Sequence, residues 1–242
     1  MKIVDCFWEQ ENIGKKTVEI SIESTDRYDE NALMQCVRGY EYAVIKVPMN
    51  MPLFNFGLAQ MGFCCIETQM NLSIAFNNFD FSLVKHLYDD TTYQVVEREE
   101  DYQDVLSRIE PGMFSTDRIS IDPVFGETIG CKRYINWIAS EFLCGSSRLI
   151  RIYYGKSQVG FMLIKIDDKN VKLLLNGLYK QFQGMGLGFL TPASPYMYAK
   201  RDNLFVEKET TSISSNNIPA GKLYNRLHFQ RDSQTYVFVK HL

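Results

Sequence analysis

The chain has 242 residues, of which 45% are hydrophobic, and a formal net charge of -3. This length allows one large domain or two small ones. A weakly acidic chain lacks the basic face that nucleic acid requires, and no apolar run is long enough to span a bilayer. We therefore expect neither nucleic acid nor a membrane as a partner.

The cysteine pattern indicates neither a metal site nor a disulfide framework. Six cysteines and three histidines are present, and no two cysteines have the Cys-x-x-Cys spacing, so we expect no metal. Most of the cysteines have apolar neighbours, which favours buried thiols in a reducing compartment. The first five residues lack the apolar core of a signal peptide, so a cytoplasmic protein is expected.

The first third of the chain alternates strand and helix patterns. Strands are predicted by alternating or continuous apolar runs, and helices by longer amphipathic stretches. The expected strands are 17–22, 41–47 and 68–76, and the expected helices are 30–39 and 53–61. Residues 77–92 are rich in Asp, Asn and Thr and are expected to connect two domains.

The remainder also mixes strands and helices, which predicts an α/β (α+β) fold. Strands are expected at 93–97, 148–154, 158–166, 171–179, 204–210 and 235–240, and helices at 101–109, 134–142 and 217–229. The segment 113–128 has no regular pattern, and long irregular segments inside compact domains are often functional.

A glycine-rich stretch follows the apolar strand 171–179. It comprises Gln183, Gly184, Met185, Gly186, Leu187 and Gly188. Glycines let the backbone approach a ligand closely, and N–H groups at a helix start attract phosphate. The dinucleotide fingerprint is excluded because Phe189 occupies its third glycine position, and the Walker loop because Phe189 and Leu190 replace its Lys and Ser/Thr.

The remaining spacing, Gln183-x-x-Gly186-x-Gly188, resembles the pyrophosphate loop of the GNAT acyltransferases, Q/R-x-x-G-x-G/A. A second stretch resembles the motif N-x-x-A-x-x-x-Y-x-x-x-G-F of that family. Asn217, Ala220, Tyr224 and Phe229 are in register, and His228 replaces the glycine. The resemblance covers about residues 92–242 and is nearest to the dTDP-fucosamine acetyltransferase group. It implies a GNAT domain with a splayed, mixed central sheet at 89–242, after a smaller, incomplete GNAT-like domain at 1–88.

The resemblance also implies a chemistry. Acetyl-CoA would be the cosubstrate, with its phosphates on the backbone of 183–188 and its pantetheine arm against Asn217. The amide of Leu178 would stabilise the thioester oxygen, with a bulge permitted by Gly177, and Tyr224 would protonate the leaving thiolate. A buried tyrosine with a structural hydrogen bond is the alternative for Tyr224. The base that deprotonates the amine stays open among Glu127, Asp122, His228 and a water chain.

The expected acceptor is a nucleotide-linked amino sugar. Residues 118–123 resemble the Arg-Phe-x-x-Asp-Pro segment of sugar-nucleotide acetyltransferases, with Ile119 replacing Phe. Arg118, Asp122 and Tyr134 would then bind the acceptor. An Arg118–Asp122 ion pair and a turn role for Asp122 are equally open, and core packing of Tyr134 with Trp137 is favoured over a platform for base stacking. A small amine or peptide acceptor, a non-catalytic acyl-CoA-binding protein, and a homodimer also stay open.

Two further features bear on the fold. Pro192 and Pro195 fall where a helix should follow the glycine loop, and an internal proline costs roughly 3 kcal/mol, so a break with a restart at Ser194-Pro195 stays open. Residues 58–63 can also be aligned with 224–229, which indicates either a weak internal repeat or a chance similarity.

Overall fold

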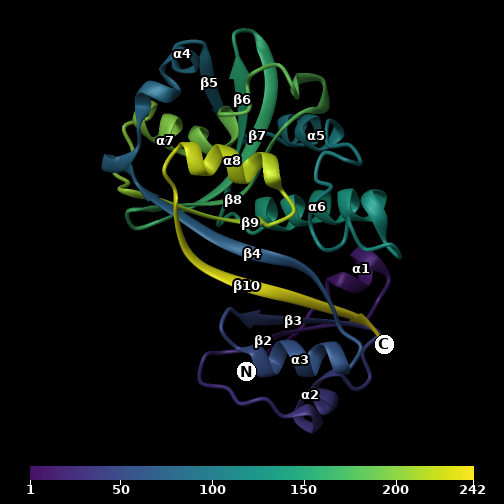
Figure 1. Cartoon of the computed structure of the whole chain (residues 1–242). Coiled ribbons are helices and arrows are strands. Elements are labelled where there is room, and N and C mark those ends of the chain that lie inside the picture. Colours follow the sequence, from purple (N-terminus) through teal and green to yellow (C-terminus); the bar gives the residue numbers. More distant parts are fainter.

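The computed structural model describes all residues from 1 to 242, and its strands form one ten-stranded sheet in the order β1-β2-β3-β10-β4-β9-β8-β7-β6-β5 (Figure 1). The strands are β1 Lys2–Asp5, β2 Thr17–Ser21, β3 Tyr42–Pro48, β4 Cys64–Ala75, β5 Thr91–Val95, β6 Arg148–Tyr154, β7 Ser157–Asp167, β8 Asn170–Leu178, β9 Lys208–Ser214 and β10 Gln230–His241. The helices are α1 Glu9–Ile13, α2 Glu30–Val37, α3 Pro52–Gln60, α4 Lys85–Tyr88, α5 Glu99–Ser107, α6 Gly126–Leu143, α7 Leu190–Arg201 and α8 Ile218–Arg226, with short 3-10 turns at Phe76–Asn78, Phe81–Leu83 and Lys180–Phe182.

Helices cover both faces of the sheet in each half of the molecule. In the half that contains β6 to β9, the helices α7 and α8 pack on one face and α5 and α6 on the other (Figure 1). In the half that contains β1 to β3, the helices α2 and α3 cover one face, and α1 lies on the other. Strands buried on both faces become apolar throughout, which explains the continuous apolar runs of β3 and β7.

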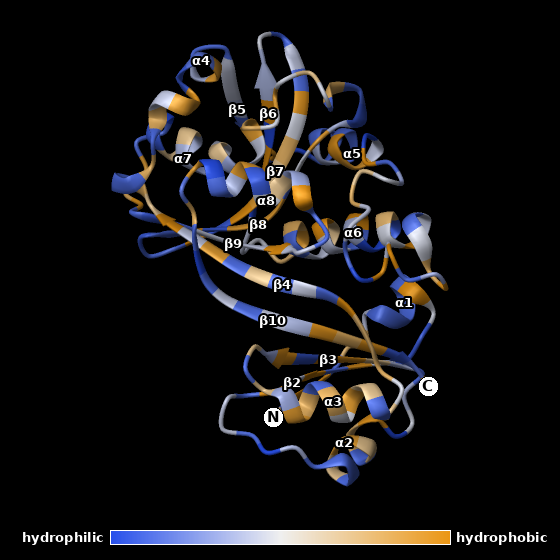
Figure 2. Ribbon diagram, viewed as in Figure 1, coloured by the Kyte–Doolittle hydropathy of each residue, from blue (hydrophilic) through white to orange (hydrophobic).

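Two long neighbouring strands join the halves. Strand β4 begins beside the end of β10, where Cys64 pairs with Val239, and continues into the other half, where residues 69–75 pair with 208–214 of β9. Strand β10 begins in the other half and ends against β3, where residues 235–241 pair with 42–48. Figure 2 shows the change along β10 from hydrophilic to hydrophobic as it enters the core of the first half. Each half therefore gives one strand to the other.

The helices of the units α3–β4 and α8–β10 end in the same way. Gly62 and His228 both have left-handed backbones, with φ of 81° and 64°. The N–H of Phe63 donates to the carbonyl of Leu58 at 2.9 Å, as the N–H of Phe229 donates to the carbonyl of Tyr224 at 3.1 Å. A glycine suits the left-handed position after a helix, which accounts for the glycine that His228 replaces. A duplication at the origin of this likeness stays a prediction.

Most of the expected elements are present, with two corrections. The strand expected at 204–210 lies at Lys208–Ser214, and the helix expected at 134–142 extends over Gly126–Leu143. The helix does not break at Ser194-Pro195, a point that the sequence left open, because α7 runs unbroken from Leu190 to Arg201 with Pro195 inside it. Pro195 cannot donate to the carbonyl of Thr191, and the side-chain amide of Asn176 donates to that carbonyl instead.

Candidate functional site

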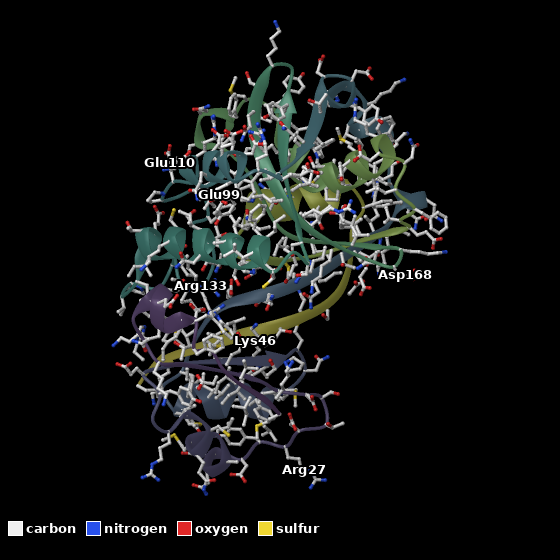
Figure 3. The ribbon with its side chains drawn as sticks, turned by 180° about the vertical axis from the view of Figure 1, so that it is seen from behind. Arg27, Lys46, Glu99, Glu110, Arg133 and Asp168 are labelled. Carbon is white, nitrogen blue, oxygen red and sulfur yellow. The ribbon has the colours of Figure 1, made fainter.

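A cavity of about 1180 Å³ lies between the two halves. Its wall combines α1 and parts of β2, β3 and β4 with the 112–118 segment, α6, β8, β9, the glycine loop and α8. Figure 3 shows the labelled Arg133 on α6 and Lys46 on β3 at this junction, one from each half. Both halves thus build the candidate site.

The sheet opens at this cavity because β8 and β9 separate. Their parallel pairing runs only from Asn170, opposite Lys208, to Leu173, opposite Thr211. The next residue, Leu174, is a bulge, since Leu173 and Leu175 face consecutive residues of β7. A bulge bends its strand and ends the regular pairing. The expectation of a bulge at Gly177 is therefore wrong.

A close contact, and not a bulge, explains the glycine at position 177. A Cβ at this position would lie 2.8 Å from the terminal methyl group of Met113 and 3.2 Å from the ring of Phe114. Glycine therefore lets the irregular segment before α6 pack directly against β8.

The amide of Leu178 points toward the opened side of β8. The N–H of the next residue, Tyr179, donates to the carbonyl of Val159 at 2.9 Å, on the β7 side. Successive N–H groups of a strand point to opposite edges, so that of Leu178 faces away from β7, where β9 has already separated. This leaves a backbone donor directed at the cavity.

The glycine loop connects this strand end to α7. Gly184 and Gly186 have φ of 77° and 81°, and a Cβ at either would meet nothing within 4 Å. The side-chain amide of Gln183 donates to the carbonyl of Leu178 at 3.1 Å and ties the loop to the strand. Open space beside a left-handed glycine is a place where a ligand can approach the backbone.

Not every residue of the loop faces the cavity. Gln183, Gly184 and Gly188 line it, whereas Gly186 and its two neighbours do not. Met185 is exposed, and Leu187 is buried in the core beneath α7.

Tyr224 on α8 lies at the inner wall of the cavity. Its side chain is buried, and its hydroxyl interacts with the side chains of Thr211 and Asn176. Burial and the neighbouring Glu209 raise the pKa of Tyr224, so the phenol stays protonated at neutral pH. Asn176 therefore serves both α7 and the hydroxyl of Tyr224, a role that its position in the sequence does not reveal.

Glu209 on β9 is buried beside Tyr224 and has no partner. Neither carboxyl oxygen of Glu209 has a hydrogen-bond partner, and its exposed fraction is 0%. Burial raises the pKa of Glu209 well above its usual range, which keeps the carboxyl neutral.

Asn217 begins α8. Its side-chain oxygen accepts from the N–H of Ala220 at 3.1 Å, which is an N-cap. The residue also lines the cavity. The cap occupies the oxygen and leaves the side-chain amide free to contact a ligand.

Arg118 and Asp122, both expected to bind the acceptor, lie in different environments. Arg118 lines the cavity, but its guanidinium faces Glu9 at 3.4 Å rather than Asp122. Asp122 lies outside the cavity wall, buried, with His241 at 2.9 Å and the amide of Val124 donating to it at 2.9 Å. The ion pair between Arg118 and Asp122 is thus absent, and the turn role of Asp122 is present.

Tyr134 combines two of its expected environments. It lines the cavity and packs against Phe114, with the ring centroids 4.6 Å apart, and against Trp137 at 6.3 Å. Burial raises the pKa of Tyr134, with Asp117 adding to the effect. Trp137 also lines the cavity, so the pair forms an aromatic wall.

The first half adds cavity residues that were not expected from the sequence. They include Glu9, Glu19, Lys46, Glu67 and Gln69. Strand alternation places Glu67 and Gln69 on one face of β4, but no local signal indicates that β4 crosses into the second half.

Two structural observations concern other classes of site. No three His, Cys, Asp or Glu side chains gather in a group that could hold a metal ion. None of the helices combines the length and the apolar composition needed to cross a bilayer.

The comparisons with known proteins show the fold. No family model matches the sequence, and no curated protein matches it. Among solved structures, a conserved protein of unknown function from Staphylococcus epidermidis ATCC 12228 is 16% identical, with a TM-score of 0.61 over 93% of this chain and 84% of that one. A GCN5-related N-acetyltransferase from Kribbella flavida is 12% identical, with a TM-score of 0.58 over 93% and 81%.

A third similar structure is a tandem GNAT protein from the clavulanic acid biosynthesis pathway. It is 12% identical, with a TM-score of 0.55 over 93% of this chain and 74% of that one. The chain therefore has the GNAT fold, as the sequence motifs predicted. These neighbours give no indication of the dTDP-fucosamine group.

Proposed function

We propose that the chain is an acetyl-CoA-dependent N-acetyltransferase that acetylates the amine of a small acceptor held between its two halves. One observation carries the proposal: a glycine loop, the opened end of β8 at Leu178 and the buried phenol of Tyr224 converge on a single cavity. The GNAT fold of the similar structures supports this assignment, although a fold alone does not fix a reaction.

Each part of the cavity suits one step of acetyl transfer. Backbone N–H groups between Gln183 and Gly188 would hold the pyrophosphate of CoA, and Asn217 would contact the pantetheine arm. The free amide of Leu178 would stabilise the negative charge that develops on the thioester oxygen. The amine attacks the carbonyl carbon, the carbon–sulfur bond breaks, and Tyr224 donates its proton to the thiolate.

The charges of the cavity favour a cationic amine as acceptor. Its wall holds five carboxylates but only three cations, Lys46, Arg118 and Arg133. Two of these cations face Glu9 at 3.4 and 2.8 Å, and the third faces Glu19 at 2.8 Å. An excess of negative charge attracts an ammonium group.

A nucleotide-linked amino sugar is the second candidate acceptor. It is supported by the position of Arg118 on the cavity wall, where the guanidine nitrogen Nε is buried without a partner. A phosphate could accept from that nitrogen.

A panel of amines tests the proposal. Spermidine, tyramine, lysine and TDP-4-amino-4,6-dideoxygalactose would each be incubated with acetyl-CoA and the full chain, with thiol release and the acetylated product measured. We expect amine-dependent release that is faster with the simple cations than with the nucleotide sugar. Binding of acetyl-CoA without release on any amine would indicate a non-catalytic acyl-CoA-binding protein, and the absence of both would contradict the proposal.

A further inference from the structure

The base that activates the amine was left open by the sequence, and its three side-chain candidates lie outside the cavity. Glu127, Asp122 and His228 are absent from the cavity wall. Glu127 and His228 are exposed, and Asp122 is engaged by His241. A base must reach the proton that it removes, so the base is expected among the carboxylates that line the cavity.

Two of these carboxylates are neutralised by cations. Glu9 accepts from the guanidinium of Arg133 at 2.8 and 3.2 Å and faces Arg118. Glu19 accepts from Lys46 at 2.8 Å, and although burial opposes its ionisation, the nearby cations lower its pKa. A carboxylate stabilised in this way is a poor proton acceptor.

Asp117 and Glu11 also line the cavity but are unsuited as the base. Asp117 accepts from the hydroxyl of Ser120 at 2.8 Å and from the N–H of Ile119 at 2.9 Å, so it serves the turn before α6. Glu11 is exposed on α1. The remaining carboxylate is that of Glu67, which forms no ion pair within 4 Å.

The register of β4 places Glu67 beside the opened part of the sheet. Gln69 lies directly opposite Ser214 at the end of β9, and Glu67 is two residues earlier on the same face of β4. The hydroxyl of Ser214 interacts with the carboxyl of Glu67. Both Glu67 and Ser214 line the cavity that Leu178 and Tyr224 also line.

We propose that Glu67, supplied by the first half of the chain, is the residue that takes the proton from the acceptor amine. This assignment rests on the proposed function. It gives the strand exchange between the halves a catalytic consequence, since the second half alone contains no Glu67.

The surroundings of Glu67 suit a base that works near neutral pH. Burial raises its pKa, and Asp117 adds to the rise, whereas Ser214, Arg118 and Lys46 act against it. The pKa of Glu67 is raised on balance, which brings it closer to the neutral pH at which a base would work.

An ammonium acceptor must lose two protons from nitrogen to become an amide. The ammonium group of the acceptor gives one proton to the carboxylate of Glu67, which later releases it to solvent. The neutral amine then forms the nitrogen–carbon bond as the carbon–sulfur bond breaks. Sulfur takes a proton from Tyr224, and the second proton that the nitrogen must lose restores the phenol.

The variant Glu67→Gln tests the assignment, with the amine of the panel that gives the fastest thiol release as acceptor. The shape of the side chain is kept and its basicity is removed. We expect kcat/KM at neutral pH to fall roughly 100- to 10,000-fold, the usual range for general acid–base catalysis, with acetyl-CoA affinity unchanged. The loss should shrink as the pH rises, because an acceptor that is already neutral needs no base. Glu97→Gln, an exposed glutamate without an ion pair, is the matched control and should keep full activity.

The outcomes separate this assignment from the proposed function. A wild-type chain that releases no thiol with any amine overturns the proposed function and this assignment with it. If wild type is active and a folded Glu67→Gln variant has a kcat/KM within about twofold of wild type, with the same pH profile, this assignment alone is overturned. If Glu67→Gln does not fold, Glu67→Asp keeps the charge but moves it, and full activity of that variant would equally contradict the role.

Discussion

Tyr224 combines the features of a proton donor with those of a core residue. Its ring packs edge-to-face on Phe229, with centroids 4.8 Å apart, while its hydroxyl interacts with Thr211 and Asn176. We expect Tyr224→Phe to keep the fold and the affinity for acetyl-CoA, because only the hydroxyl is lost, and to lower kcat roughly 100- to 10,000-fold. Steady-state kinetics beside a thermal melt would measure both effects. Turnover within about twofold of wild type, together with a lowered Tm, would instead identify the hydroxyl as structural.

Glu209 gives the stability of the protein a dependence on pH. Burial raises its pKa well above the unfolded value, so the folded chain holds a proton that the unfolded chain releases above about pH 4.3. The contribution of Glu209 to stability is therefore full below that pH and is lost as the pH rises toward the folded pKa. The loss is about 1.4 kcal/mol per pH unit for a single proton.

Removing this proton uptake should flatten the pH dependence. We expect the Tm of wild type to fall relative to that of Glu209→Gln between pH 5 and pH 8, roughly in line with that slope. Thermal melts across this range measure it, and Glu207→Gln, at an exposed glutamate just before β9, is the control. Parallel pH profiles of wild type and Glu209→Gln would show that Glu209 is ionised in the folded chain.

At the scale of elements, the glycine loop is the feature that most directly concerns acetyl-CoA. Gly184 lines the cavity and has a left-handed backbone with open space around it, so a valine there is strained and would fill the space beside the loop amides. We expect Gly184→Val to weaken acetyl-CoA binding roughly 10- to 100-fold, as the loss of about 1.5–3 kcal/mol from a hydrogen bond to a charged group implies. Calorimetry measures it.

A matched control separates strain from ligand binding. Gly155, in the turn between β6 and β7, also has a positive φ, 57°, and no atom within 4 Å of a Cβ. Gly155→Val should lower the Tm to a similar degree and leave acetyl-CoA affinity unchanged. Equal affinity of a folded Gly184→Val variant and wild type would remove the loop from the proposed site.

The elements that follow from local patterns could be predicted from the sequence, whereas those set by distant contacts could not. Apolar alternation and turn residues suffice for the β6–β7 hairpin around Gly155, and a capping Asn suffices for the start of α8. The unbroken α7 escaped prediction because Asn176, on another strand, satisfies the carbonyl that Pro195 leaves free. Likewise, the bulge at Leu174 arises from pairing with β7 and leaves no residue signature.

At the scale of the whole molecule, the exchange of β4 and β10 makes the halves interdependent. A fragment 89–242 would lack β4, whose residues pair with both β9 and β10 and place Leu72 and Ile74 in the core of the second half. We expect this fragment alone not to fold cooperatively. Coexpressed fragments 1–88 and 89–242 should instead purify together as a folded complex. Circular dichroism and thermal melts provide the test, and a sharp melting transition for 89–242 alone would contradict the expected dependence.

This exchange also limits how much of the candidate site could be predicted. The residues of the second half, such as Leu178, Gly188 and Tyr224, follow motifs that are local in the chain, and the cavity brings them together. The contribution of the first half, with Glu67 and Glu9, depends on β4 and α1 packing against elements distant in the chain. The pairing of Arg118 with Asp122, which the sequence left open, is absent for the same reason, since Glu9 approaches Arg118 from α1.

A crystal structure of the chain with acetyl-CoA would show whether the opened end of β8 and the glycine loop form an acyl-CoA site. We expect the pyrophosphate against the backbone of residues 183–188, the thioester oxygen at the N–H of Leu178 and the sulfur within reach of the hydroxyl of Tyr224. All contacts with the CoA moiety should come from residues after position 92. Acetyl-CoA bound mainly by residues 1–76, or away from Leu178, would show that these elements do not form the acyl-CoA site.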